Sequence, residues 1–314
     1  MSIAEAILSG DIKALAKVIS KLENSHPEGW EVLRSLYNRV GQAAIIGITG
    51  APGVGKSTLV SGIARVYLEK GFKVAILAVD PSSPFTGGSI LGDRIRMQHT
   101  SPNLYYRSLA SRGHLGGLSV SAGSIINLLD ASGYQRIIVE TIGTGQGEVE
   151  IRDYAHTVIV VNAPNLGDDI QAMKAGILEI GDIFVVNKSD LPGADMAVAE
   201  LNDMLGLRKT KDADWQIPVI PVTARSGKGI KELVDCIEKH YGYLAAQNRL
   251  LAFRKKIVER EIRQGLINLL WNQALACLKT DGLWDQTCEK VARAELDPQS
   301  AINQLFKRIA KITD

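Results

Sequence analysis

The segment that most constrains the fold matches the pattern GxxxxGK[ST] at every fixed position, from Gly50 to Ser57. An apolar, β-branched run precedes it and a helix-length segment follows it, which is the setting of a phosphate-binding loop. Glycines let successive backbone N–H groups turn toward a phosphate, and the start of a helix adds its positive dipole end. The pattern therefore predicts a nucleotide site in an α/β domain. The residues assigned to it are Gly50, Ala51, Pro52, Gly53, Val54, Gly55, Lys56, Ser57 and Thr58.

Short apolar runs alternate with helix-length segments through the middle of the chain. The runs are continuous rather than alternating in polarity, which is typical of strands buried on both faces of a parallel sheet. The expected strands cover 44–49, 73–80, 136–141, 157–162, 183–187 and 218–222, and the expected helices cover 56–70, 169–180, 195–205 and 229–240. This order predicts an α/β, mostly parallel, doubly wound sheet. We divide the chain into an N-terminal helical extension (1–40), a P-loop domain (41–245) and a C-terminal helical arm (246–314).

Bulk composition excludes several classes of protein. Lys and Arg total 36 against 34 Asp and Glu, so the net charge of +2 gives no reason to expect nucleic-acid binding. No apolar run reaches the ~18 residues that span a bilayer, so no membrane association is expected. Three cysteines without a CxxC pair predict reduced thiols in a cytoplasmic protein, rather than a disulfide framework or a zinc ribbon.

A second motif indicates which base the site reads. Asn187, Lys188 and Asp190 form NKxD at the end of an expected strand, as in P-loop GTPases. A carboxylate at Asp190 can accept hydrogen bonds from N1–H and the exocyclic amine of guanine, whereas adenine offers no such pair. Asn187 is expected to bond the purine edge or to tie neighbouring loops together, and the Lys188 stem to cover the base. A second base-contacting loop is expected after the last strand, at Thr223, Ala224 and Arg225.

Three carboxylates stand at or near expected strand ends beside the loop: Asp80, Asp93 and Glu140. With the Ser57 hydroxyl they form the oxygen donor set that Mg²⁺ prefers, some of them acting through water. Lys56 is expected to reach the β- and γ-phosphates. Asp80 has the alternative role of capping a turn, and Asp93 the alternative of pairing with Arg96.

The segment Glu140-Thr141-Ile142-Gly143 stands where many GTPases have DxxG. A glycine N–H at Gly143 can bond the γ-phosphate, so that loss of this phosphate releases the loop. Thr144 stands where a Ras-type glutamine would directly follow, which predicts slow intrinsic hydrolysis accelerated by a partner or by dimer rearrangement. We therefore assign catalysis to Lys56, Asp80, Glu140 and Gly143. Charge-stabilising and structural roles both remain open for Arg94, Arg96, Arg107 and Arg112.

Read together, these stretches resemble the MeaB/ArgK-type GTPases, chaperones of adenosylcobalamin-dependent acyl-CoA mutases such as methylmalonyl-CoA mutase. The resemblance covers essentially the whole chain, and its combination of motifs is far more specific than the phosphate loop alone. The matching stretches are IAEAILSGDIKALAKVISKLEN, GITGAPGVGKSTL, VAILAVDPSSPFTGGSILGDRIRM, IIVETIGTGQGE and GDDIQAMKAGILEIGDIFVVNKSD.

The resemblance implies a Mg²⁺-dependent GTPase that forms a homodimer, with the C-terminal arm contributing, and whose GTP and GDP states are read by the partner mutase. It implies an additional switch segment at 165–174 that couples the nucleotide to that partner. No DxHxxG pattern is present, so we expect no cobalamin bound by this chain itself. The expected switch residues are Thr144, Gly145, Gln146, Asp168, Asp169, Gln171 and Lys174.

Other classes fit the sequence less well. A nickel metallochaperone GTPase would carry His-rich tracts or close Cys/His pairs, whereas this chain has five scattered histidines. A ParA-like ATPase would have lysine directly after the first glycine of the loop, where Ala51 stands. A kinase or ATPase serving basic amino-acid transport is a further alternative, and tight ATP binding would favour it.

Overall fold

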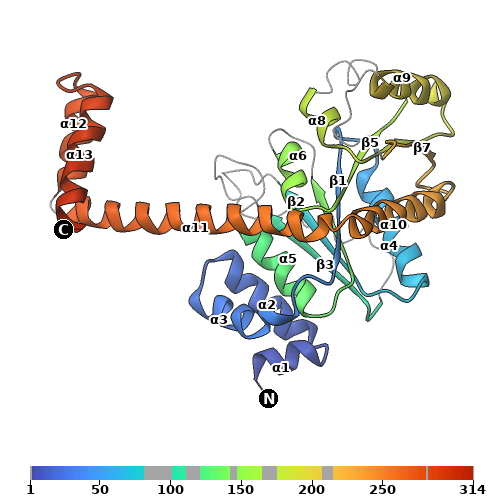
Figure 1. The fold of residues 1–314 in the computed structure, drawn as a ribbon, viewed down its shortest axis with the longest axis horizontal. Coiled ribbons are helices and arrows are strands. Elements are labelled where there is room, and N and C mark those ends of the chain that lie inside the picture. Colours follow the sequence, from blue (N-terminus) through green and yellow to red (C-terminus); the bar gives the residue numbers. More distant parts are fainter. Residues whose placement is uncertain are drawn as a thin grey trace. The chain divides into compact units, whose positions relative to one another are not determined.

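A computed structural model provides the fold of residues 2–80, 101–110, 121–141, 147–164, 175–206, 215–280 and 282–313. These residues form a seven-stranded sheet in the order β3-β2-β4-β1-β5-β6-β7, and every neighbouring pair is parallel (Figure 1). The strands are β1 (Ala44–Thr49), β2 (Val74–Asp80), β3 (Leu104–Ala110), β4 (Arg136–Thr141), β5 (Thr157–Asn162), β6 (Ile183–Asn187) and β7 (Val219–Val222). The expected α/β class with a doubly wound parallel sheet is confirmed.

The described helices begin with three at the N-terminus and end with three at the C-terminus. They are α1 (Ile3–Leu8), α2 (Ile12–Glu23), α3 (Pro27–Leu36), η1 (Tyr37–Arg39), α4 (Lys56–Glu69), α5 (Ser121–Ala131), α6 (Gly147–Glu150), η3 (Ile151–Asp153), α8 (Ala175–Ile180), α9 (Ala194–Gly206), α10 (Ile230–Ala246), α11 (Arg249–Thr280), α12 (Leu283–Ala292) and α13 (Pro298–Thr313).

Two apolar layers cover the two faces of the sheet. On one face, α4 and α10 pack over strand residues such as Ile46 and Ile76. On the other, α5, η3, α8, α9 and the N-terminal helices pack over residues such as Val139 and Val158. Side chains of the central strands are buried on both faces, and each fully buried aliphatic side chain stabilises the fold by about 1.5–3 kcal/mol. This explains why the runs are continuously apolar.

The edge strand β3 and helix α5 were not expected from the sequence. Arg107 interrupts the apolar pattern of β3, but its guanidinium pairs with Glu23 of α2 and donates to Ser20 Oγ at 3.0 Å. Arg107 therefore joins the N-terminal helices to the sheet. Of the two roles left open for it, charge stabilisation and structure, this is the structural one. Arg94, Arg96 and Arg112 lie outside the described residues.

Local sequence signals explain where the N-terminal helices begin. Ser2 and Glu5 form a reciprocal capping box at α1, and the Asp11 carboxylate accepts from two backbone N–H groups at the start of α2. One stripe of α2 is buried against the rest of this unit. These helices belong to the same compact unit as the sheet, which comprises residues 1–257.

Residues 258–314 form a second compact unit. Within it, α12 and α13 pack against each other, and the rings of Trp271 and Trp284 meet edge to face at 5.7 Å. Leu278, Thr287 and Ala301 are buried. Among the described residues, no helix combines the length and the apolar character that crossing a bilayer requires.

The β7 edge of the sheet carries a proline. At the β7 edge, Pro221 pairs in register with Val186 of β6. Proline lacks a backbone N–H, so it is tolerated in strands chiefly at sheet edges. The carbonyl of Val222 accepts from the Ser189 N–H at 3.1 Å, so the backbone groups of Val222 point toward β6. Those of the preceding residue, Pro221, therefore point away from β6.

Stability is expected to depend on pH through His156. Its Nδ1 accepts from the Ile45 N–H at 3.0 Å, and its ring packs against Tyr241 and Phe253. Burial, with a smaller contribution from His240, lowers the pKa of His156 from 6.5 to about 4. The unfolded chain therefore binds this proton first as pH falls, so folding stability is lost progressively between pH 6.5 and 4. The expected loss is up to about 3 kcal/mol.

Urea unfolding of the wild type and of His156→Asn at several pH values measures this contribution. Asparagine can still accept a hydrogen bond but does not titrate, so carboxylate titrations cancel in the difference. The wild type should lose more stability than the variant over the stated window. Equal losses in both proteins would show that His156 is not the responsible group.

Candidate functional site

The phosphate loop connects the end of β1 to the start of α4. Two of its glycines have a positive φ angle and also lie so close to neighbouring atoms that a side chain has no room. Gly50 has φ +138°, and a Cβ there would clash with the carbonyl oxygen of Val161. Gly55 has φ +95°, and a Cβ there would clash with the Asn187 amide. Both close approaches hold the loop against neighbouring strands, so the glycines serve the local backbone and not only the ligand.

Lys56 begins α4 and lies folded over this loop. Its side chain is buried, and Nζ donates to the carbonyls of Gly50 at 2.6 Å and Ala51 at 2.9 Å. The ammonium is thus held at the mouth of the loop, with its positive charge where the phosphates of a nucleotide would enter. Thr58 follows in the first turn of α4 and is exposed.

Ser57 and Glu140 meet across the site from different elements. Ser57 Oγ donates to Glu140 Oε1 at 2.7 Å, and the Glu140 side chain is only 4% exposed. A buried carboxylate beside a hydroxyl oxygen, at the end of a strand and the start of a helix, is the hard oxygen donor pair that Mg²⁺ prefers. The residues present therefore fit this ion.

The other predicted metal and switch residues fall partly outside the described chain. The backbone places Asp80 at the carboxyl end of β2. The residue before it, Val79, pairs with Thr141 of β4. Nothing is described of the Asp80 side chain. The remaining predicted residues that lie outside the described part are Asp93, Gly143, Thr144, Gly145, Gln146, Asp168, Asp169, Gln171 and Lys174.

Asn187 ties three loops together. Its Nδ2 donates to the Val54 carbonyl at 2.7 Å, and its Oδ1 accepts from the Ala224 N–H at 3.0 Å. The neighbouring Lys188 donates from Nζ to the Gly53 carbonyl at 2.9 Å, and its φ of 58° is unusual for a non-glycine residue. The NKxD segment is thus fastened to the phosphate loop and to the loop after β7.

The side chains available to a base lie at the margin of this arrangement. Asp190 and Arg225 are exposed, whereas Thr223 and Ala224 are buried. Ser189 Oγ and Thr223 Oγ1 lie 3.0 Å apart, so the two candidate base loops are also joined by a hydroxyl pair. This arrangement holds Asp190 on a fixed support while leaving its carboxylate open to a ligand.

Two buried hydroxyls near the site were not among the sequence-predicted residues. Thr141 Oγ1 donates to Thr49 Oγ1 at 3.0 Å, and both side chains are buried. In the sequence, each of these threonines is a polar residue at the carboxyl end of a largely apolar strand, and this position is the one feature that could have indicated them. Their pairing depends on the register of β1 and β4, which one sequence does not reveal.

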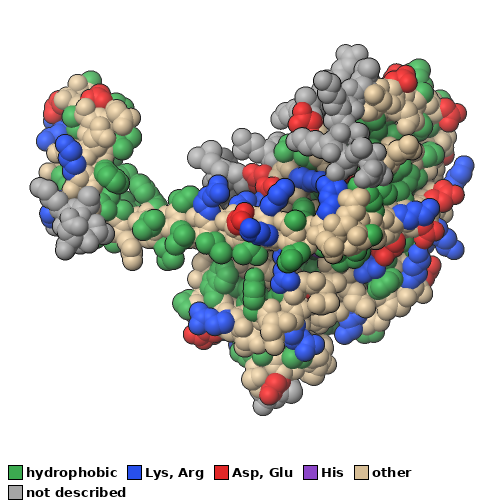
Figure 2. Space-filling view, in the orientation of Figure 1, with side chains coloured by type: hydrophobic (Ala, Val, Ile, Leu, Met, Phe, Trp, Pro, Cys, Tyr) green, Lys and Arg blue, Asp and Glu red, His purple; other side chains and the backbone are tan. Residues whose placement is uncertain are grey.

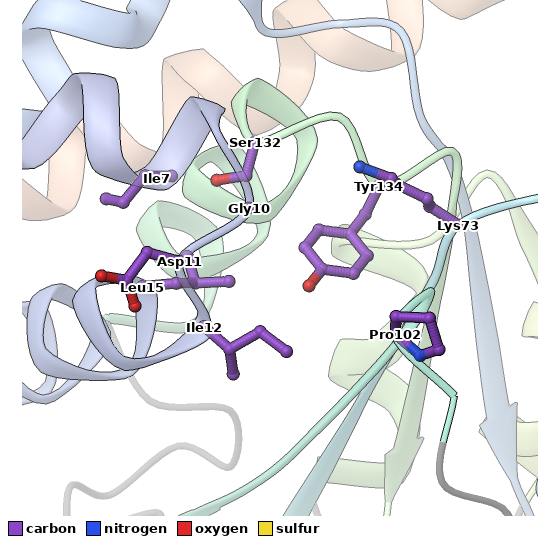
Figure 3. A pocket seen from close by; sticks show the side chains of 9 residues that line it. All are labelled: Ile7, Gly10, Asp11, Ile12, Leu15, Lys73, Pro102, Ser132 and Tyr134. Carbon is purple, nitrogen blue, oxygen red and sulfur yellow. The ribbon is translucent and has the colours of Figure 1, made fainter.

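A small cavity lies at the opposite, amino-terminal end of the strands (Figure 3). Its volume is about 30 Å³, enough for one or two waters. Burial raises the pKa of Tyr134 at its wall to about 12, so this phenol stays protonated. The residues lining it are Ile7, Gly10, Asp11, Ile12, Leu15, Lys73, Pro102, Ser132 and Tyr134. Because the phosphate loop follows the carboxyl end of β1, this cavity is separate from the nucleotide site.

No group of three or more His, Cys, Asp and Glu side chains that could hold a metal ion occurs within the described ranges. The donor pair at Ser57 and Glu140 is of a different kind, since a nucleotide's phosphates and waters complete such a magnesium site.

Comparison with known proteins reveals extensive similarity. The profile of the family described as Methylmalonyl Co-A mutase-associated GTPase MeaB matches residues 15–278. A putative GTPase of Pyrococcus abyssi is 43% identical over 309 residues, covering 97% of this chain and 95% of that protein. GTPase ArgK of Escherichia coli is 33% identical, covering 96% and 93%. The mitochondrial methylmalonic aciduria type A homolog of mouse is 32% identical, covering 96% of this chain and 77% of that protein.

A solved structure shares the fold over nearly the full length. The crystal structure of LAO/AO transport system kinase matches with a TM-score of 0.73 and 26% sequence identity. The match covers 98% of this chain and 96% of that one. The similarity therefore includes the helical segments on both sides of the sheet domain in the sequence.

Proposed function

Because the chain belongs to the family of the methylmalonyl-CoA mutase-associated GTPase MeaB, we propose that it serves as a GTP-driven chaperone of an adenosylcobalamin-dependent acyl-CoA mutase such as methylmalonyl-CoA mutase. In this proposal the GTP and GDP states gate cofactor loading or protect the mutase. The mutase-directed part of the proposal is supported by the family match over residues 15–278. The observation that carries its GTPase part is the convergence of Lys56, the Ser57–Glu140 pair and Asn187 on one loop. Cobalamin itself is bound by the mutase and not by this chain.

The proposed reaction is attack of water on the γ-phosphoryl group of GTP. A bond forms between the water oxygen and the γ-phosphorus while the bond from that phosphorus to the β–γ bridging oxygen breaks. GDP and inorganic phosphate leave, and the protons of the water go to the released phosphate and to solvent. Lys56 and the loop N–H groups hold the phosphates in line and stabilise their negative charge. Ser57 and Glu140 hold Mg²⁺, which when bound neutralises charge on the phosphate oxygens. Asp80 and Asp93 complete the acidic surroundings, and the N–H of Gly143 contacts the γ-phosphate.

Guanine selection is assigned to the edge of the same site. We place the Asp190 carboxylate opposite N1–H and the exocyclic amine of guanine. Lys188 covers the base with its stem, and Thr223, Ala224 and Arg225 line the opposing loop. The support for this placement is the set of hydrogen bonds that join these loops to the phosphate loop.

We propose that intrinsic hydrolysis is slow and that the partner mutase accelerates it. Thr144 stands where a glutamine would orient the attacking water in Ras-type enzymes, so the chain lacks that water-positioning group at this position. The nucleotide state is communicated through the segments that contain Thr144, Gly145 and Gln146 and, after β5, Asp168, Asp169, Gln171 and Lys174.

We further propose a homodimer in which residues 246–314 form the dimerisation arm. Large apolar side chains are unusually exposed in the second compact unit, and green hydrophobic side chains follow α11 in Figure 2. An apolar surface of this extent marks an interaction site in a folded protein. The exposed large apolar residues of that unit are Ile262, Leu266, Ile267, Leu269, Leu270, Trp271, Ile302 and Phe306. The mass of the full chain from light scattering tests this assembly directly.

The chaperone proposal predicts a specific response to one mutase. GTP turnover by the full chain is measured alone and with methylmalonyl-, isobutyryl-, ethylmalonyl- or hydroxyisobutyryl-CoA mutase added singly. One of them should raise kcat by about tenfold or more, because it supplies groups that the isolated site lacks. The same mutase should co-elute with this chain in the presence of a non-hydrolysable GTP analogue. A protein that neither responds to nor co-elutes with any of them is not such a chaperone, even if it binds GTP.

A second candidate function follows from the similarity to LAO/AO transport system kinase: a kinase or ATPase linked to basic amino-acid transport. Competition between ATP and labelled GTP separates the two functions. The guanine-reading role of Asp190 predicts that ATP competes only weakly. Equal affinity for the two nucleotides would favour the transport-linked function.

A further inference from the structure

The three central strands end in polar residues on the same face of the sheet. Thr141 of β4, Thr49 of β1 and Asn162 of β5 are all buried. They follow Val139, Gly47 and Val160 by two positions. A Cβ on Gly47 would point at Ile151 of η3 and at Ala155. Because side chains alternate between faces along a strand, all three lie on the face opposite α4. The rest of each strand on this face is apolar or glycine.

Stability alone does not require this polar row. Asn162 Nδ2 is buried and has no hydrogen-bond partner among the described residues, so within that part of the chain it contributes no stabilising contact. Two hydroxyls that bond to each other contribute little net stability, because an apolar pair of the same shape fills the space about as well. The polar row therefore calls for another explanation at this end of the sheet.

The hydrogen bond between Thr141 and Thr49 lies at the point where two strands separate. The ladder between β1 and β4 ends at the pair Ile48↔Glu140. One residue beyond it, Thr141 Oγ1 donates to Thr49 Oγ1 at 3.0 Å and lies 3.5 Å from the Ile48 carbonyl oxygen. From here β1 continues into the phosphate loop, so a side-chain bond takes over from the backbone ladder.

The same bond adjoins the predicted magnesium donors. Glu140 directly precedes Thr141 and points to the other face, where its Oε1 accepts from Ser57 Oγ at 2.7 Å. Thr49 directly precedes Gly50, the first residue of the phosphate loop. Fixing Thr141 to Thr49 therefore fixes the backbone that carries Glu140 relative to the loop that leads to Ser57.

We propose that the Thr49–Thr141 hydroxyl pair positions Glu140 against Ser57, and thereby sets the affinity of the site for Mg²⁺ in the nucleotide complex. The inference rests on the proposed Mg²⁺-dependent GTPase function. Both threonines are positioning residues, since they act through Glu140 and the loop and do not touch the ligand.

Valine and serine substitutions test the pair in the full-length protein. Thr141→Val leaves the Thr49 hydroxyl buried without this donor, so urea unfolding should begin at a lower concentration. The double variant Thr49→Val/Thr141→Val removes both hydroxyls and should recover most of that stability. It should nevertheless need about tenfold more Mg²⁺ for half-maximal GTP hydrolysis, while GTP binding in EDTA changes less than twofold. Thr141→Ser, which keeps the hydroxyl, should retain the wild-type Mg²⁺ requirement.

The control is Thr157→Val at the opposite end of β5, where Thr157 Oγ1 lies 2.9 Å from His240 Nδ1. This variant loses a buried hydroxyl contact of the same kind far from the phosphate loop, so it should lower stability without changing the Mg²⁺ requirement. A double variant with wild-type Mg²⁺ dependence overturns the inference, as does an equal effect of Thr157→Val. A wild type that hydrolyses GTP without Mg²⁺, or not at all, instead contradicts the proposed function.

Discussion

Replacement of Asp190 by asparagine is expected to exchange guanine recognition for xanthine recognition. The carboxylate accepts two hydrogen bonds from guanine in the proposed complex, and hydrogen bonds to a charged group are worth about 1.5–3 kcal/mol each. Their loss should weaken GTP binding by about 100-fold or more. Xanthine carries a carbonyl where guanine carries the exocyclic amine, and the asparagine amide can donate to it. XTP should therefore bind the variant more tightly than GTP does.

Fluorescent-nucleotide titrations of the wild type and the variant with GTP, XTP and ATP measure this exchange. Asp203→Asn is a matched control, because Asp203 is an exposed aspartate on α9. It should leave all three affinities unchanged. Asp190 is exposed and the hydrogen bonds that join its loop to the phosphate loop come from neighbouring residues, so the fold should survive the substitution. If the Asp190 variant binds GTP as the wild type does, the NKxD segment does not read the base.

Replacement of Lys56 by alanine is expected to lower kcat for GTP hydrolysis by about 100- to 1,000-fold. In the structure the ammonium bonds the carbonyls of Gly50 and Ala51, which keeps it at the mouth of the loop. In the proposed complex this ammonium stabilises the negative charge of the phosphates. A water molecule in its place would carry no charge and would not be held in a fixed position, so the stabilisation would be lost. Single-turnover hydrolysis at saturating GTP measures the chemical step directly.

Lys70→Ala provides the control for this variant on the same helix segment. Lys70 caps the far end of α4, where its Nζ pairs with the exposed Asp235 at 2.8 Å. Loss of an exposed ion pair costs about 1 kcal/mol or less, so both stability and kcat should stay near wild type. Circular dichroism shows whether Lys56→Ala remains folded. A folded Lys56 variant with undiminished hydrolysis would remove the loop from the catalytic machinery.

The central sheet was predictable because its strands are buried on both faces and are therefore continuous apolar runs in the sequence. The expected strands at β1, β4, β5 and β6 agree with the structure to the residue, and those at β2 and β7 to within one. Strand β3 was missed because its Arg107 finds its partner, Glu23, in a helix far away in the sequence. A polar residue with a distant partner looks, in a local pattern, like a loop residue.

The site divides in the same way between local and distant information. The phosphate loop and NKxD are continuous motifs, so their residues were named from the sequence, and the structure brings Lys56, Ser57 and Asn187 together with Glu140. The Thr49–Thr141 pair could not be named, because it depends on which strand lies beside which and in what register. Motifs thus reveal the groups that meet the ligand, whereas register reveals the groups that hold them.

Proline at the sheet edge has a consequence for how this protein can assemble. Pro221 lies in β7, and its backbone faces away from β6, so the outer side of this strand lacks a donor where a regular ladder would need one. A second chain cannot extend the sheet by simple strand addition past this residue. Uncontrolled polymerisation through the β7 edge is thereby disfavoured.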